Sequence, residues 1–194
     1  MCDPANPWVC WLPESPLLIK MGSGPWQLTG LDDPVRFDIR ADDHMLTMGW
    51  TASGADIAFL ALDRNGNGAV DDGSELFGNA TPLPNGHRAS NGFVALAQYD
   101  ENHDEMIDAS DPIWNSLLLW TDGNHDGISQ SDELTPISAT AVTTIGLKNH
   151  WTGRHDASGN LFRYEAVVRI GNRVQAFYDV YFVTTMPPRP PVPH

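Results

Sequence analysis

Long hydrophobic runs and cysteines are scarce in this chain of 194 residues. No apolar run approaches the roughly 18 residues of a membrane-spanning helix, and no signal peptide is visible, because Met1 is followed at once by Cys2. The only other cysteine is Cys10, and a disulfide between the two would suit an oxidising compartment. A cysteine at this place is also typical of a mature bacterial lipoprotein, so a lipid anchor at Cys2 is an alternative. Two free thiols are the third interpretation.

Basic residues are also few. Eleven Lys and Arg stand against 25 Asp and Glu, which gives a formal net charge of −14. Between residues 63 and 133, 14 acidic residues are accompanied only by Arg64 and Arg88. Such a field repels nucleic acid and anionic membranes, so neither is expected as a partner. Bound cations would neutralise the field, whereas a merely solubilising acidic surface would not require the regular spacing described below.

Nucleophile motifs of the Gly-x-Ser-x-Gly kind are absent, so a hydrolase is disfavoured and no catalytic residue is expected. The apolar content of 41% is normal for a globular protein. We expect a single domain (17–184) between an irregular N-terminal arm (1–16) and a proline-rich C-terminal tail (185–194).

Alternating apolar residues predict strands, most clearly in the last third of the chain. The segments 160–170 and 174–184 flank Gly171-Asn172-Arg173, which predicts a β-hairpin over 160–184. The side chains expected to share one face of its first strand are Phe162, Tyr164, Ala166, Val168 and Ile170.

Apolar residues at helical spacing predict only short helices. One is expected around residues 93–97 and another in the segment from Pro112, as its first residue, to Trp120. The predicted class is therefore α+β, in which EF-hand-like calcium loops and short helices pack on antiparallel β-structure with a C-terminal β-hairpin.

Three acidic loops with oxygen-bearing side chains at alternate positions occupy the middle of the chain. They begin Asp63-Arg-Asn65-Gly-Asn67-Gly68, Asp100-Glu-Asn102-His-Asp104-Glu105 and Asp122-Gly-Asn124-His-Asp126-Gly127. A hard cation such as Ca²⁺ takes roughly six to eight oxygen ligands, and side chains at loop positions 1, 3 and 5 converge when the backbone curls around it. The spacing predicts calcium loops at 63–75 (loop 1), 100–111 (loop 2) and 122–133 (loop 3).

Calcium loops of this type add a carbonyl at position 7, often a water at position 9, and a bidentate carboxylate at position 12. The candidate ligands are Asp63, Asn65, Asn67, Ala69, Asp71 and Glu75 in loop 1; Asp100, Asn102, Asp104, Met106, Asp108 and Asp111 in loop 2; and Asp122, Asn124, Asp126, Ile128 and Glu133 in loop 3. The carbonyls would come from Ala69, Met106 and Ile128.

Three positions depart from this scheme. Glu75 falls at position 13, so either loop 1 is one residue longer or Glu75 is displaced. Glu105 replaces the glycine of position 6, which implies strain where a positive φ is needed. Ser129 stands where an apolar residue usually anchors the loop to the core.

Other metals are less suitable. Magnesium is the chemical competitor but prefers compact octahedral sites, and zinc or copper would take His and Cys ligands. His103 and His125 occupy position 4, whose side chain is expected to point into solvent. His150, His155 and Asp156 are close in sequence, but a polar loop before the hairpin is the simpler interpretation.

A wider set of motifs resembles a known family. The runs are Leu62-Asp-Arg-Asn-Gly-Asn-Gly68, Gly73-Ser-Glu-Leu-Phe-Gly78, Asn91-Gly-Phe93, Trp120-Thr-Asp-Gly-Asn-His-Asp-Gly-Ile-Ser-Gln130 and Glu133-Leu134. Together they resemble bacterial secreted EF-hand-like proteins related to the calcium-dependent self-processing module of iron-regulated RTX proteins. The resemblance covers about residues 15–147 and implies calcium as cofactor.

In the self-processing modules, the resemblance implies, an Asp carboxylate attacks its own carbonyl in an Asp-Pro bond to give an anhydride, which water or a lysine amine opens. The matching bond here is Ser15-Pro16, and serine cannot form this anhydride. Asp3-Pro4, Asp33-Pro34 and Asp111-Pro112 remain as Asp-Pro bonds. Asp33 lies inside the expected domain and Asp111 is a predicted calcium ligand, so Asp3-Pro4 in the N-terminal arm is the candidate for cleavage. The family's first aspartate-rich segment is also replaced here, with Lys20 where an acid is expected.

The sequence thus favours a non-enzymatic, extracellular or surface-attached domain that folds or rigidifies on binding Ca²⁺. The alternative is a calcium-dependent self-cleaving or transpeptidating module. The tryptophans Trp8, Trp11, Trp26 and Trp151 could contact an unknown protein or glycan partner, although tryptophans are more often core residues.

Overall fold

The computed structural model describes residues 14–185, so the expectations for Cys2, Cys10, Asp3-Pro4 and the tail from residue 186 onwards lie outside the described residues. The described elements are, in chain order, β1 (Leu17–Lys20), β2 (Val35–Phe37), β3 (Leu46–Met48), β4 (Ile57–Ala61), α1 (Gly92–Ala97), β5 (Met106–Asp108), the 3₁₀ helix η2 (Pro112–Ser116), β6 (Leu118–Trp120), β7 (Leu134–Pro136), the 3₁₀ helix η3 (Ile137–Ala139), β8 (Val142–Gly146), β9 (His150–His155), β10 (Leu161–Ile170) and β11 (Arg173–Tyr181).

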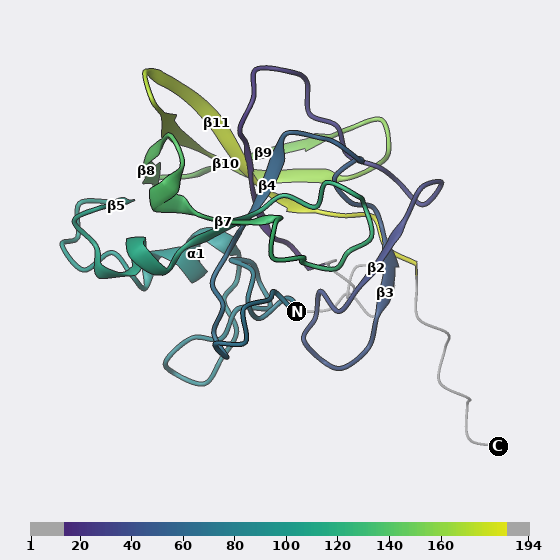
Figure 1. The fold of residues 1–194 in the computed structure, drawn as a ribbon, viewed down its shortest axis with the longest axis horizontal. Helices are drawn as coiled ribbons and strands as arrows, with labels where there is room; N and C mark the ends of the chain where they lie inside the picture. Colours follow the sequence, from purple (N-terminus) through teal and green to yellow (C-terminus); the bar gives the residue numbers. More distant parts are fainter. Residues whose placement is uncertain (1–13, 186–194) are drawn as a thin grey trace.

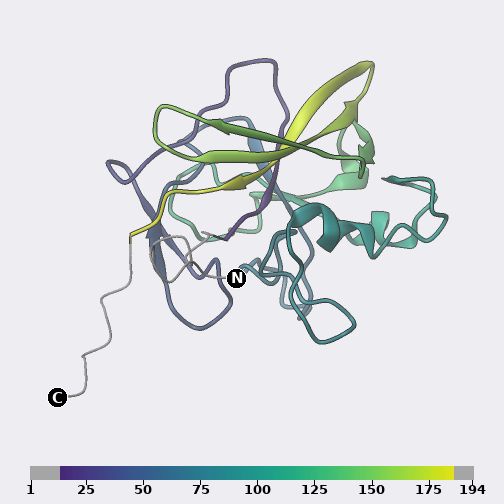
Figure 2. The same cartoon turned by 180° about the vertical axis from the view of Figure 1, so that it is seen from behind.

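Nine of the strands form one antiparallel sheet, which curls strongly (Figures 1 and 2). Its order is β5-β8-β10-β11-β1-β4-β6-β7, and β9 pairs with the first half of β10, while β8 pairs with its last three residues. The remaining strands, β2 and β3, form a separate two-stranded ribbon. The short first strand β1 therefore lies at the centre of the sheet, between β11 and β4.

The predicted α+β class is wrong. Strands account for 36% of the residues and helices for only 8%. The fold is therefore mostly β, and among residues 14–185 the only α-helix is α1, which has six residues. The segment after Pro112 shows why. It forms only the 3₁₀ turn η2 and then β6, which pairs with both β4 and β7. A strand with side chains buried on both faces is apolar throughout, and such a run cannot be distinguished from a buried helix by periodicity.

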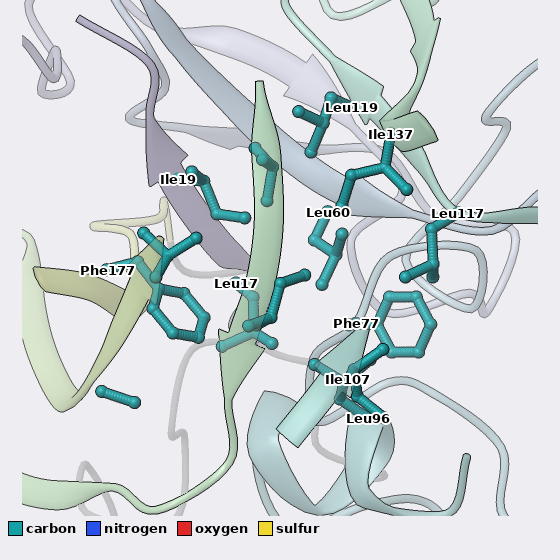
Figure 3. Close-up of a cluster of buried hydrophobic side chains, with 14 of the residues drawn as sticks. Leu17, Ile19, Leu60, Phe77, Leu96, Ile107, Leu117, Leu119, Ile137 and Phe177 are labelled. Atoms are coloured by element: carbon teal, nitrogen blue, oxygen red, sulfur yellow. The ribbon is translucent and has the colours of Figure 1, made fainter. Parts of the chain in front are cut away.

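Apolar side chains cover both faces of the sheet centre. Residues of β1 and β4 alternate between two buried clusters: Leu17, Ile19 and Leu60 lie in one, and Leu18 and Phe59 in the other. Figure 3 shows the first cluster, in which the β1 and β4 side chains meet Phe77 and Leu96. The second cluster is aromatic, with Trp50, Phe59, Trp120 and Phe182 in ring contact beneath the β2–β3 ribbon. Burial on both faces accounts for the uninterrupted apolar sequence of β4.

The long hairpin is formed by β10 and β11, which pair from Leu161–Tyr181 to Ile170–Arg173. A bulge at Arg163 shifts the register between Phe162 and Tyr164. Phe162 therefore packs in the second cluster, whereas Ala166, Val168 and Ile170 belong to the first. The expectation that Phe162 shares their face is wrong, because one extra residue reverses the alternation of side chains.

Candidate calcium-binding loops

The three acidic loops share one backbone conformation. In each of them φ is positive at positions 4 and 6, with values from 60° to 84°. These positions are Gly66 and Gly68 in loop 1, His103 and Glu105 in loop 2, and His125 and Gly127 in loop 3. The expected left-handed conformation of Glu105, with φ of 64°, is therefore confirmed. A left-handed residue other than glycine costs about 1–2 kcal/mol, so loop 2 carries a local strain that glycine would remove.

Glu105→Gly is expected to stabilise the protein by about 0.5–1 kcal/mol, since the relief of strain exceeds the entropy that glycine adds to the unfolded chain. Glu101→Gly is the matched control. Glu101 is another exposed glutamate of loop 2 but has no positive φ, so this change should destabilise. Denaturant unfolding of both variants measures the difference, and equal effects would contradict the strain at Glu105.

The carboxylate at position 1 is the hydrogen-bond centre of each loop. Asp63, Asp100 and Asp122 all accept the main-chain N–H groups of positions 5 and 6, and Asp63 and Asp122 also accept that of position 4. The distances lie between 2.6 and 3.2 Å. The backbone thus curls around this carboxylate in all three loops.

Positions 3 and 5 repeat the same pattern. The side-chain oxygen at position 3 accepts the N–H of position 5, and the oxygen at position 5 accepts the N–H of position 7, at 2.8–3.1 Å in every loop. The residues concerned are Asn65, Asn67 and Ala69; Asn102, Asp104 and Met106; and Asn124, Asp126 and Ile128. These bonds orient the side-chain oxygens along the inside of the turn.

The last carboxylate of each loop connects its two ends. Glu75, Asp111 and Glu133 each accept the N–H groups of positions 2 and 9, at distances from 2.8 to 3.4 Å. Glu75 and Asp111 are 2% and 1% exposed. Glu75 at position 13 therefore occupies the same place as Asp111 and Glu133 at position 12. Two residues before Glu75, Gly73 packs so closely on Ile39 that a Cβ atom would lie 1.9 Å from the Ile39 carbonyl oxygen.

Loops 1 and 3 are joined to each other at position 8. The Val70 N–H donates to the Ser129 hydroxyl at 2.6 Å, and this hydroxyl donates to the Val70 carbonyl at 3.2 Å. Ser129 is 9% exposed, so it is buried like an anchor residue but acts through hydrogen bonds. Loop 2 lies apart from this pair, and its β5 segment pairs with β8.

Two tryptophans of the aromatic cluster reach the carboxylates of loop 3. The Trp50 indole N–H donates to Asp122 at 2.8 Å, and that of Trp120 donates to Glu133 at 3.3 Å. Sequence reasoning missed both contacts, and no local spacing relates Trp50 to a loop 72 residues later. They fix the first and last carboxylates of loop 3 to the core.

The two histidines at position 4 differ. His103 is exposed, as expected. The expectation is wrong for His125, whose side chain is only 10% exposed. Its Nδ1 lies 2.6 Å from the Thr51 carbonyl oxygen and its Nε2 lies 3.2 Å from the Asp33 carbonyl oxygen. His125 thus attaches loop 3 to two segments of the chain that are distant in sequence.

The side chains of the loops supply oxygen donors. In loop 1, Asp71 accepts from the side-chain amides of both Asn65 and Asn67, and in loop 3, Asp126 accepts from those of Asn124 and Gln130. The side chains at positions 3, 5 and 9 thus meet in these two loops. In loop 2, Asn102 contacts Asp104, whereas Asp108 accepts the N–H of Ser110.

Carboxylates, amides and carbonyls fit a hard cation better than zinc or copper. Within residues 14–185, no group of three or more His, Cys, Asp and Glu side chains is arranged to hold a metal by itself. A calcium site would therefore need the Asn side chains and main-chain carbonyls as well. The roles of the Ala69, Met106 and Ile128 carbonyls stay predictions.

Similarity to known proteins defines the class of this chain. The model of the SPM domain family matches residues 17–183, and the chain belongs to this family. The chain is also 38% identical over 124 residues to the iron-regulated protein FrpA of Neisseria meningitidis serogroup C. This match covers 64% of the chain but only 11% of FrpA, so the chain corresponds to a small part of that relative. The expected relation to iron-regulated bacterial proteins is confirmed.

No helix among residues 14–185 is long and apolar enough to cross a membrane.

Proposed function

We propose that this protein is a calcium-binding domain that Ca²⁺ folds or rigidifies through loops 1, 2 and 3. The observation that carries the proposal is the main-chain hydrogen-bond scheme that three loops with different sequences share at positions 1, 3, 5 and the last carboxylate. The carboxylate at position 1 accepts main-chain N–H groups of the turn, and the side-chain oxygens at positions 3 and 5 accept those of positions 5 and 7. The last carboxylate accepts N–H groups from both ends of the loop. Bound Ca²⁺ would supply charge neutralisation, which the 14 acidic residues between 63 and 133 otherwise lack.

Ligands would come from the residues that the loop spacing identifies, including Glu75. Because Glu75 accepts the same two N–H groups as the carboxylates at position 12 of loops 2 and 3, the structure supports its inclusion. An extracellular or surface location suits calcium sites of ordinary affinity.

Glu75→Gln tests the assignment in loop 1. The amide keeps the size of the side chain but removes one anionic oxygen, so calcium stoichiometry should fall by one site, or the affinity of one site should fall at least tenfold. Asp72→Asn is the control, because Asp72 lies in the same loop but its carboxylate accepts from Ser74. Calorimetric titration of both variants gives the answer. Unchanged binding by the Glu75 variant would remove Glu75 from the ligand set.

A second candidate function, calcium-dependent self-cleavage, is favoured by the surroundings of the Asp33-Pro34 bond. The Asp33 carbonyl oxygen lies 3.2 Å from His125 Nε2, which is part of loop 3. The Asp33 carboxylate is 70% exposed and lies 3.6 Å from the same nitrogen. Among the other described candidates, Asp111 is buried with both oxygens engaged by N–H groups.

The cleavage reaction needs only groups that are present. A carboxylate oxygen of Asp33 attacks the Asp33 carbonyl carbon and forms a cyclic anhydride, while the C–N bond to Pro34 breaks and the proline nitrogen takes a proton. In the form of His125 with protons on both ring nitrogens, Nδ1–H donates to the Thr51 carbonyl and Nε2–H donates to the Asp33 carbonyl oxygen, where it would stabilise the developing negative charge. Water then opens the anhydride to two carboxylic acid groups.

The test is a denaturing gel with mass spectrometry after incubation with and without calcium. Denaturation is essential, because β1 precedes the bond and lies between β11 and β4, so the fragments would stay together in the native protein. Cleavage predicts a break after residue 33 that needs calcium, is lost in Asp33→Ala and is slowed in His125→Ala. An intact chain under all conditions would refute self-cleavage at this bond.

A further inference from the structure

A buried carboxyl group lies in β11, away from the acidic loops. Asp179 is 0% exposed. Its Oδ2 accepts the N–H of Gly92, the first residue of α1, at 3.2 Å, whereas its Oδ1 has no hydrogen-bond partner among the described residues. Burial raises the pKa of Asp179 to about 7, although the Ser15 hydroxyl, the Gly92 N–H and the Arg163 guanidinium act in the opposite direction. The Ser15 hydroxyl is thus close, but it forms no hydrogen bond of ordinary geometry.

Strand register brings further polar groups to the same place. Leu17 of β1 pairs with Asp179, and the Val180 N–H donates to the Pro16 carbonyl at 3.0 Å. Continuing this register places Ser15 opposite Tyr181, on the sheet face that Leu17 and Asp179 share.

Arg163 joins this group from the bulge of β10. Its guanidinium carbon lies 4.9 Å from the centre of the Tyr181 ring. Like Asp179 Oδ1, three polar atoms around it are buried and have no hydrogen-bond partner among residues 14–185. They are the Ser15 hydroxyl, the Tyr181 hydroxyl and Arg163 Nε. Ser15 and Tyr181 are each 1% exposed.

Four buried polar atoms without partners at one place call for a shared ligand. A buried polar atom without a hydrogen-bond partner is destabilising, and buried polar groups in proteins are almost always paired. The charges of the neighbouring groups limit the kind of ligand. The positive Arg163 guanidinium would repel a cation, and the Asp179 carboxyl group would disfavour an anion. A small neutral molecule that both donates and accepts hydrogen bonds fits, and a buried water typically makes about three such bonds.

We propose that the Ser15 hydroxyl, Asp179 Oδ1 and the Tyr181 hydroxyl bind one buried water molecule, with Arg163 Nε as its fourth neighbour. This site joins the segment before β1 to β11. Through Asp179 and Gly92 it also connects to α1, which ends three residues before loop 2 begins. The water site does not depend on calcium binding.

Magnetic relaxation dispersion of water oxygen-17 counts long-lived internal waters and tests the site directly. Tyr181→Phe and Ser15→Ala should each lose one such water or shorten its residence time at least tenfold. Asp179→Asn, which keeps a polar group at the same place, should retain it. Ser138→Ala is the control, because Ser138 is exposed and far along the chain from these residues.

An identical count of long-lived waters in the wild type, Tyr181→Phe and Ser15→Ala would overturn the proposal. If either variant fails to fold, a crystal structure of the wild type decides. Electron density for a water within hydrogen-bonding distance of all three oxygens supports the site, and its absence from a well-ordered map overturns it.

Discussion

Asp179→Asn is expected to raise the stability of the protein at pH 8 by about 3 kcal/mol more than at pH 5. For a domain of this size, the difference corresponds to a rise in Tm of about 6–12 °C. Asparagine keeps the oxygen that accepts the Gly92 N–H and removes the ionisable group.

The direction follows from proton binding. The pKa of Asp179 is about 7 in the folded protein, against an ordinary value of 3.8, because burial disfavours the charged carboxylate. The folded chain therefore binds more protons than the unfolded chain between these values. Stability from the neutral carboxyl group is fully present below pH 3.8 and is lost as the pH rises towards 7. The facing charged and titratable groups are Arg163, Tyr164 and Tyr181, and Arg163 limits the loss.

Thermal unfolding between pH 5 and pH 8 measures the effect. Asp32→Asn is the control, since it removes the same charge from an exposed position and changes the overall repulsion equally. The wild type and the control should lose stability with rising pH in parallel, while the Asp179 variant should be flatter. Equal slopes for all three proteins would show that Asp179 is ionised in the folded state.

Removal of calcium is expected to have the second large effect. A site filled at 100 times its dissociation constant contributes about 2.7 kcal/mol to stability, so chelation should lower Tm by about 5–11 °C for each occupied site. The loss should be large here, because the carboxylates of Asp63, Asp100 and Asp122 would then repel their neighbours without compensation. Calorimetry with and without a chelator measures the change.

Sodium chloride at high concentration separates this effect from general screening. Screening by salt weakens repulsion between exposed charges without filling a site, so it should restore only part of the lost stability. Full recovery by sodium chloride, or no change of Tm on chelation, would contradict specific calcium sites.

Much of the candidate site can be predicted from the spacing of residues in the loops. The alternation of acids and amides from Asp63, Asp100 and Asp122 is a local property, and the hydrogen bonds that follow are local too. The position of Glu75 cannot be predicted from the spacing, because at position 13 it still accepts the N–H groups of Arg64 and Asp71, as the carboxylates at position 12 do in the other loops. The contact of Trp50 with Asp122 depends on the sheet.

Secondary structure was harder to infer for a related reason. A sheet whose centre is buried on both faces gives apolar runs without alternation, so the sequence predicts a helix that includes the residues of β6. The bulge at Arg163 has no signal in the alternating sequence of β10, yet it moves Phe162 to the opposite face. The bulge also brings Arg163 towards Asp179, so the sequence alone does not predict this buried polar group.

Calcium titration of chelator-stripped protein, followed by calorimetry and with magnesium as the control, tests the central claim most directly. Calcium bound by the loops predicts two or three sites of micromolar to millimolar affinity that magnesium does not fill equally. Absence of binding heat together with absence of a stability gain would contradict the claim and leave the repeated loop geometry as a purely structural feature.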